Sequence, residues 1–77
     1  MVKAYVLVVT NPGETHAVAL KLKSTPAVTE VHEVMGPYDI VAEVEVEQLT
    51  DVPAVIIQQI RAIPGIQSTT SLVAFPV

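Results

Sequence analysis

The sequence predicts an α+β protein of βαββαβ order, a ferredoxin-like sandwich in which two helices cover one face of an antiparallel sheet. The chain repeats itself after half its length, so that residues 23–28 (Lys-Ser-Thr-Pro-Ala-Val) align with residues 61–66 (Arg-Ala-Ile-Pro-Gly-Ile). Each half holds a β-branched run, an amphipathic segment, a proline stop and a second β-branched run. At 77 residues, the two halves together make one small domain.

The first half carries distinct strand and helix signals. Residues 4–9 form an unbroken apolar run, which is typical of a strand buried on both faces. Residues 11–14 (Asn-Pro-Gly-Glu) favour a helix start, with Asn11 as the cap and a glutamate that closes a capping box. This helix is expected to end near residue 25, before a proline. Residues 28–35 mix apolar and charged side chains, which predicts an edge strand protected by its charges.

The second half repeats this order. Residues 36–39 (Gly-Pro-Tyr-Asp) predict a hairpin loop, and residues 40–46 alternate between apolar and polar side chains as a half-buried strand does. Thr50 is the expected cap of the second helix, which should end at Pro64, and residues 66–75 should form the last strand. The topology places the first and third strands in the centre, in the spatial order 4-1-3-2.

Alternation along the two central strands predicts an apolar open face. Ala4, Val6 and Val8 are assigned to the side that the helices cover. Four apolar residues then project from the open face: Tyr5, Leu7, Val9 and Val41. A contiguous apolar surface normally marks an interface, so we expect two chains to pack sheet against sheet, as in dimeric α/β barrels. Glu43 should lie at the rim of this dimer interface or pair with a cation such as Lys3 of the second chain.

Composition limits the partners and the location. The sequence has no cysteine, which excludes disulfides and thiolate metal sites. The formal charge of −4 argues against direct binding of nucleic acid, which depends on cations at phosphates. No segment approaches the roughly 18 apolar residues of a membrane span, and the N-terminus lacks the features of a signal peptide. We therefore expect a cytoplasmic protein without nucleic-acid or membrane contacts.

Two segments have the chemistry to bind a small molecule. Residues 36–39 present an aromatic ring and a carboxylate at a strand end, which suits a cationic or zwitterionic ligand, although these are also ordinary turn formers. Residues 68–71 (Ser-Thr-Thr-Ser) carry hydroxyls that could bind a carboxylate, although a polar edge strand is the simpler explanation. Taken alone, each segment is explained more simply by structure than by binding.

The sequence contains no recognisable catalytic constellation. His16 and His32 lack metal-ligand spacing, and Glu43, Glu45 and Glu47 are expected to form a solvated row rather than an acid–base pair. The glycines stand singly, and no nucleophile motif is present. We therefore expect no enzymatic activity, metal or cofactor.

The order of these motifs resembles the RAM domain, the effector-binding and assembly module of the Lrp/AsnC transcriptional regulators. The resemblance covers essentially the whole chain. It rests on residues 36–39 after a valine-rich strand, on residues 42–44 (Ala-Glu-Val), and on residues 64–66 (Pro-Gly-Ile) followed by Thr69 and Ser71. Pro37 departs from the small or acidic residue that is common at its place.

The resemblance implies one RAM-like domain over residues 1–77 that dimerises through the open face and assembles into octamers or similar rings. It also implies that an amino acid or related metabolite binds between dimers. The implied effector-binding residues are Gly36, Pro37, Tyr38, Asp39, Thr69, Ser71 and Leu72. Asp39 would bind the ligand ammonium, whereas Thr69 and Ser71 would bind its carboxylate.

Family regulators normally carry an N-terminal helix-turn-helix, whereas this chain begins at the first strand, as stand-alone RAM proteins do. A full-length Lrp/AsnC regulator is therefore a further expected partner. Two alternatives stay open: a small dimeric α/β-barrel enzyme of the monooxygenase or isomerase type, acting through His32 or Glu43, and a purely structural assembly module without a ligand.

Overall fold

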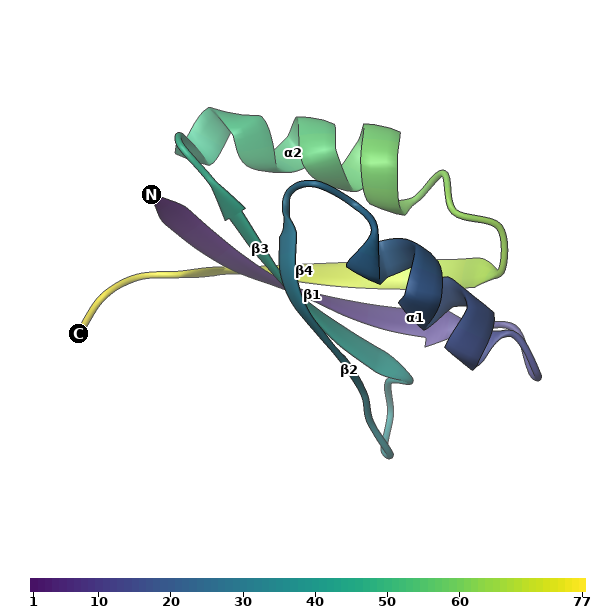
Figure 1. Cartoon of the computed structure of the whole chain (residues 1–77). Coiled ribbons are helices and arrows are strands. Elements are labelled where there is room, and N and C mark those ends of the chain that lie inside the picture. Colours follow the sequence, from purple (N-terminus) through teal and green to yellow (C-terminus); the bar gives the residue numbers. More distant parts are fainter.

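The computed structural model describes residues 1–77, which form four strands and two helical segments in the order βαββαβ (Figure 1). The second helical segment starts as a 3₁₀ turn, η1, continues as α2 and ends as a π-helical stretch, η2. The bounds are β1 (Val2–Thr10), α1 (Thr15–Lys23), β2 (Val28–Glu33), β3 (Ile40–Val46), η1 (Leu49–Asp51), α2 (Val52–Ala54), η2 (Val55–Ile60) and β4 (Ile66–Ala74).

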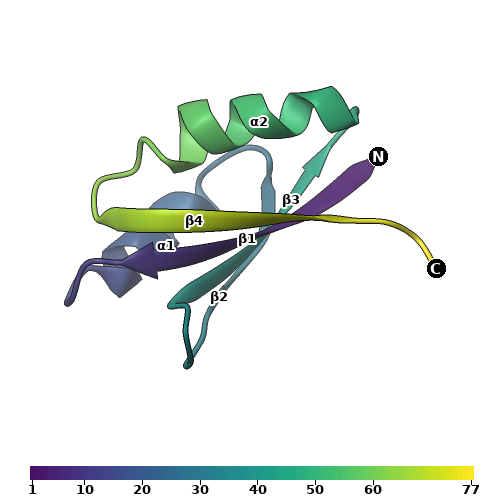
Figure 2. The same cartoon turned by 180° about the vertical axis from the view of Figure 1, so that it is seen from behind.

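The strands form one antiparallel sheet in the order β2-β3-β1-β4, which confirms the predicted topology. In the register of the sheet, Val6 of β1 lies between Ala42 of β3 and Ser71 of β4. Both helical segments pack on the same side of the sheet, which leaves its other face open (Figures 1 and 2). The two edge strands are β2 and β4, and each ends slightly before the prediction, at Glu33 and Ala74.

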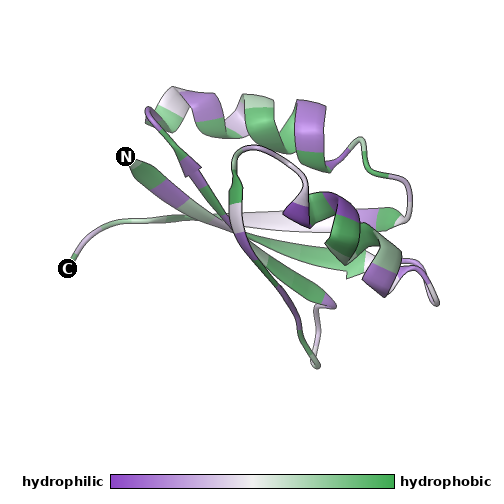
Figure 3. Cartoon of the chain, viewed as in Figure 1, coloured by the Kyte–Doolittle hydropathy of each residue, from purple (hydrophilic) through white to green (hydrophobic).

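The core lies between the helices and the sheet, and it is filled by apolar side chains. The predicted inward positions of β1 and β3 are buried, as the alternation requires. In Figure 3 the central strand β1 is largely hydrophobic, whereas the edge strand β4 is pale. The buried cluster consists of Ala4, Val6, Val8, Val18, Ala19, Leu22, Ile40, Ala42, Val44, Val46, Val52, Val55, Ile56 and Ile60.

The first helix begins differently from the prediction. Glu14 occupies the cap position and makes no side-chain capping bond, so the expected cap at Asn11 is wrong. The backbone N–H of Asn11 instead donates to the carbonyl of Gly65, 2.8 Å away, and joins the β1–α1 loop to the loop before β4. The helix also ends two residues early, because the backbone N–H groups of Ser24 and Thr25 donate to carbonyls three residues back, those of Lys21 and Leu22, instead of four residues back.

The cap of the second helical segment is Gln48 rather than the predicted Thr50. The backbone N–H of Gln48 donates to the carboxylate of Asp51 at 3.1 Å, as part of a capping box. The later turns widen, because Arg61 N–H donates to the carbonyl of Ile56, five residues back. Val52, Ile56 and Ile60 are spaced by four and are all buried. Such residues drift by about 40° per repeat in an α-helix, and the wider turns reduce this drift.

Candidate functional site

Three loops meet at one end of the sheet, and one of them contains four of the seven predicted effector-binding residues. They are the β1–α1 loop, the β2–β3 hairpin loop and the loop between η2 and β4. The antiparallel order brings them together, because β1 and β2 end where β3 and β4 begin. Both chain termini lie at the opposite end (Figure 1). This end of the sheet, defined by the three loops, is called the loop end below.

Asp39 is the most constrained residue of the hairpin loop. Its backbone N–H donates to the carbonyl of Val8 at 2.9 Å, and its carbonyl accepts the N–H of Val34 at 2.8 Å. Its carboxylate oxygen Oδ2 accepts the backbone N–H of Thr10 at 2.8 Å and lies 3.3 Å from the Thr10 hydroxyl. The second carboxylate oxygen, Oδ1, accepts no hydrogen bond within the chain. Asp39 therefore holds the loop on β1 and keeps one acceptor free.

The other three loop residues make fewer contacts. Gly36 and Pro37 are exposed, and Tyr38 is half-buried. Tyr38 has no side-chain hydrogen bond within the chain. The loop thus combines an exposed tip with an anchored last residue.

The predicted residues of β4 divide between the two faces of the sheet. Thr69 pairs with Val8, which pairs with Ile40, so Thr69 lies two strands away from the start of β3. Two strand spacings correspond to about 10 Å. Ser71 is the next residue on the same face, whereas Leu72 pairs with Tyr5 and belongs to the open face. Leu72 therefore does not share a surface with Thr69 and Ser71.

The open face carries the predicted apolar strip on its two central strands. Leu7 lies opposite Val41, and Tyr5 lies between Glu43 and Leu72. Val9 continues the strip toward the loop end and pairs with Ser68. All of the apolar residues of β1 and β3 on this face are partly exposed, in contrast to the fully buried residues that alternate with them.

Glu43 finds its cation within the same chain. Lys3 Nζ lies 3.3 Å from Glu43 Oε1, so the suggested pairing with a lysine of a second chain is not needed. The hydrogen bond that Lys3 donates to Glu43, together with the negative charges of Glu43 and Glu45, raises the pKa of Lys3. Thr29 on the edge strand also donates to Glu43 Oε1, at 3.3 Å. The charge of Glu43 is therefore balanced within the chain.

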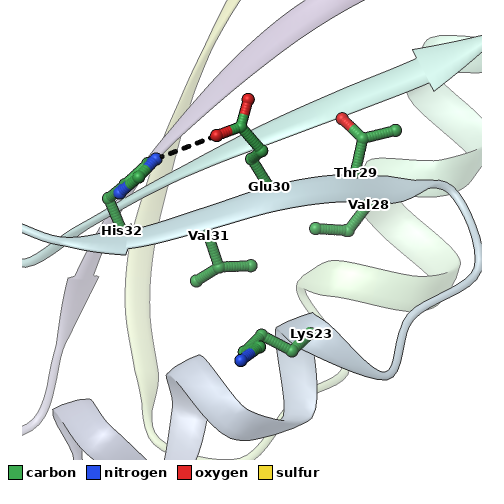
Figure 4. A pocket seen from close by; sticks show the side chains of 6 residues that line it. All are labelled: Lys23, Val28, Thr29, Glu30, Val31 and His32. Atoms are coloured by element: carbon green, nitrogen blue, oxygen red, sulfur yellow. Dashed lines mark hydrogen bonds and ion pairs between the residues drawn. The ribbon is translucent and has the colours of Figure 1, made fainter.

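The two hollows on the surface lie away from the predicted effector residues. One, of about 260 Å³, wraps the edge of β2 (Figure 4). Val28 and Val31 point toward α1 and Lys23, whereas Glu30 and His32 bond to each other on the opposite side of the strand. The other hollow, of about 290 Å³, lies near both termini and includes Lys3 and Phe75.

Thr10 is the residue of the loop end that the sequence reasoning did not single out. It is the one buried polar residue of the chain, with 6% of its surface exposed. Its hydroxyl lies 2.6 Å from the hydroxyl of Thr15, the first residue of α1. One feature of the sequence indicates this burial: Thr10 is the next inward position after Ala4, Val6 and Val8 in the alternation of β1.

The remaining titratable residues form no recognisable centre. His16 Nδ1 lies 2.7 Å from Glu33 Oε2 and joins α1 to β2, and both side chains are substantially exposed. No three His, Asp or Glu side chains gather in a geometry that could hold a metal ion. No helix of the chain is long and apolar enough to cross a membrane.

Comparison with known proteins identifies the family. The family model described as the Lrp/AsnC ligand binding domain matches residues 3–76, and the chain belongs to this family. A solved structure of a Thermus thermophilus protein has a TM-score of 0.93 and 32% identity, and the alignment covers 100% of this chain and 96% of that one. The fold and the family assignment therefore agree.

Two curated proteins are similar to this chain. An uncharacterised HTH-type transcriptional regulator of Pyrococcus furiosus is 35% identical over 75 residues, which cover 94% of this chain and 50% of the regulator. A homocitrate synthase of Sulfurisphaera tokodaii is 45% identical over 60 residues, which cover 77% of this chain and 13% of the synthase. The chain thus spans about half of the regulator and a small part of the synthase.

Proposed function

We propose that this chain is a non-enzymatic module that binds an amino acid or a related small metabolite and assembles into dimers and larger rings. The observation that carries the proposal is the apolar strip on the open face, formed by Tyr5, Leu7, Val9 and Val41. A surface of this kind at the centre of a sheet is stable when a second copy covers it. Membership in a family of ligand-binding domains supports the effector role.

In the proposed site, Oδ1 of Asp39 accepts the ligand ammonium, and hydroxyls and backbone N–H groups near Thr69 and Ser71 bind the carboxylate. Tyr38 and the exposed tip at Gly36 and Pro37 flank the ligand. The ligand completes its contacts with residues of a second dimer, so a ligand that fits the assembled state better shifts the population toward it. The absence of a hollow at these residues in one chain agrees with a site that forms only between dimers.

This chain is similar to a segment of each of two different proteins, and these two proteins indicate which classes of partner the module would act on. One is a transcriptional regulator and the other is a homocitrate synthase. We propose a full-length Lrp/AsnC regulator as the partner, because 94% of this chain aligns with the curated regulator. An enzyme as the controlled partner is the second candidate, supported by the 45% identity to part of the synthase.

Native mass spectrometry with and without the twenty standard L-amino acids tests the proposal. We expect species at even multiples of 8.2 kDa, bound mass on at least one amino acid, and a change in the distribution of species with that amino acid. A protein that stays at 8.2 kDa would refute the assembly role. Stable dimers or rings that bind none of the amino acids would leave the purely structural alternative.

Asp39→Asn separates binding from stability. Asparagine keeps an oxygen that accepts the Thr10 N–H, but it removes the charge that attracts the ammonium. A charged hydrogen bond contributes about 1.5–3 kcal/mol, so we expect affinity to fall about tenfold or more, measured by calorimetry. Asp39→Ala is the companion variant, which loses the anchor as well and should also unfold at lower urea. Unchanged affinity in Asp39→Asn would remove Asp39 from the site.

A further inference from the structure

The loop end contains one buried hydroxyl that the packing of the core does not require. Thr10 follows Ala4, Val6 and Val8 on the inward side of β1, where each other residue is apolar. Burying a hydroxyl is unfavourable unless it is hydrogen-bonded, and valine has nearly the same shape. The hydroxyl of Thr10 is therefore explained by its partners, which are Asp39 and Thr15.

The chemistry of these three side chains allows one direction of hydrogen bonding. An ionised carboxylate only accepts, so the Thr10 hydroxyl donates to Asp39 Oδ2, 3.3 Å away. With its proton used, Thr10 Oγ1 accepts the proton of the Thr15 hydroxyl, 2.6 Å away. The chain of bonds runs from the first residue of α1 through Thr10 to the carboxylate. Together with the 2.8 Å bond from the Thr10 N–H, it directs two donors to the same oxygen.

We infer that Thr10 is a positioning residue, which fixes the Asp39 carboxylate so that Oδ1 faces an incoming ammonium group. The inference rests on the proposed function for the ligand, although the contacts that carry it lie entirely within the chain. A carboxylate with one oxygen held by two donors cannot rotate freely, and a group that is ordered before binding loses less freedom when the ligand arrives. The class of ligand that benefits is an α-amino acid with a free ammonium group.

Thr10→Val tests the inference, because valine keeps the shape and the backbone N–H but removes the hydroxyl. Thr10→Ser keeps the hydroxyl and is the matched control. Calorimetry uses each standard L-amino acid that binds the unaltered protein, together with the carboxylic acid that lacks its α-amino group. We expect Thr10→Val to bind the amino acid about three- to tenfold more weakly, the size of one ordinary hydrogen bond. Thr10→Ser should bind the amino acid as tightly as the unaltered protein does. The affinity for the acid without the amino group should be the same in all three proteins.

An equal loss for the amino acid and for its analogue would overturn the inference, because it would reveal a general disturbance of the site. Unchanged affinity in Thr10→Val would overturn it as well. The χ1 rotamer of Asp39, measured by NMR scalar couplings without ligand, gives an independent readout. We expect one rotamer in the unaltered protein and in Thr10→Ser, and averaging in Thr10→Val. If no amino acid binds the unaltered protein, the proposed function fails, and the rotamer measurement alone then decides the role of Thr10.

Discussion

Replacing Gly65 with alanine tests how tightly the loop end is packed against α1. Gly65 has a φ of +98°, a left-handed conformation that costs a residue with a Cβ about 1–2 kcal/mol. A Cβ at this position would lie 2.9 Å from Val18 Cγ2 and 3.3 Å from Glu14 Cβ, which is closer than ordinary contact. Overpacking a core costs about 1–3 kcal/mol. We therefore expect Gly65→Ala to lower the free energy of unfolding by about 2–5 kcal/mol.

Gly13→Ala is the matched control, because Gly13 has a φ of +80° and nothing lies within 4 Å of a Cβ built on it. Both variants share the left-handed cost and the reduced freedom of the unfolded chain. The difference between them, about 1–3 kcal/mol, then measures the contact with Val18. Urea unfolding at equal protein concentration should place the midpoints about 1–3 M apart, at a slope of about 1 kcal/mol per M. Midpoints within about 0.3 M of each other would refute the packing argument.

Two further predictions concern the open face. Leu7→Glu should weaken dimer affinity by about a hundredfold or more in sedimentation, because a symmetric interface loses two buried leucines. The control is Ile57→Glu: Ile57 is exposed on the second helical segment, and its replacement should leave the dimer intact. The folded-state pKa of Lys3 is raised above 10.5, so its ion pair with Glu43 stabilises the fold below that pH and is lost as the pH rises through the folded value. Urea unfolding of the unaltered protein and of Lys3→Met should accordingly differ by a constant amount up to about pH 10, and the difference should shrink as the pH rises above 10.5. A difference that stays constant above pH 10.5 would contradict the pairing.

The order of elements and the faces of the central strands could be predicted because they depend on short-range patterns. Alternation along residues 40–46 fixes which side chains share a face, and the bounds of β3 agree with it. The two helix starts differ from the prediction in different ways: the second follows a local capping box of Gln48 and Asp51, whereas at the first the predicted cap residue makes a contact far along the chain. Asn11 bonds to Gly65, which is 54 residues further along the chain, and no local pattern indicates this partner.

The candidate site was predictable as a set of residue types but not as an arrangement. The family resemblance implied that Asp39, Thr69 and Leu72 act together, yet the register of β4 places Leu72 on the other face of the sheet. The role of Thr10 depends on a carboxylate 29 positions away, which only the pairing of β1 with β3 brings close.

The sequence by itself determined the βαββαβ order, the apolar strip on the sheet and the family resemblance, because each is encoded in the spacing of neighbouring residues. The tertiary structure alone decided which polar groups meet at the loop end and that Lys3 neutralises Glu43 within the chain. Such contacts join residues distant in sequence, and their geometry is set by how the strands pair and by how the helices pack on them.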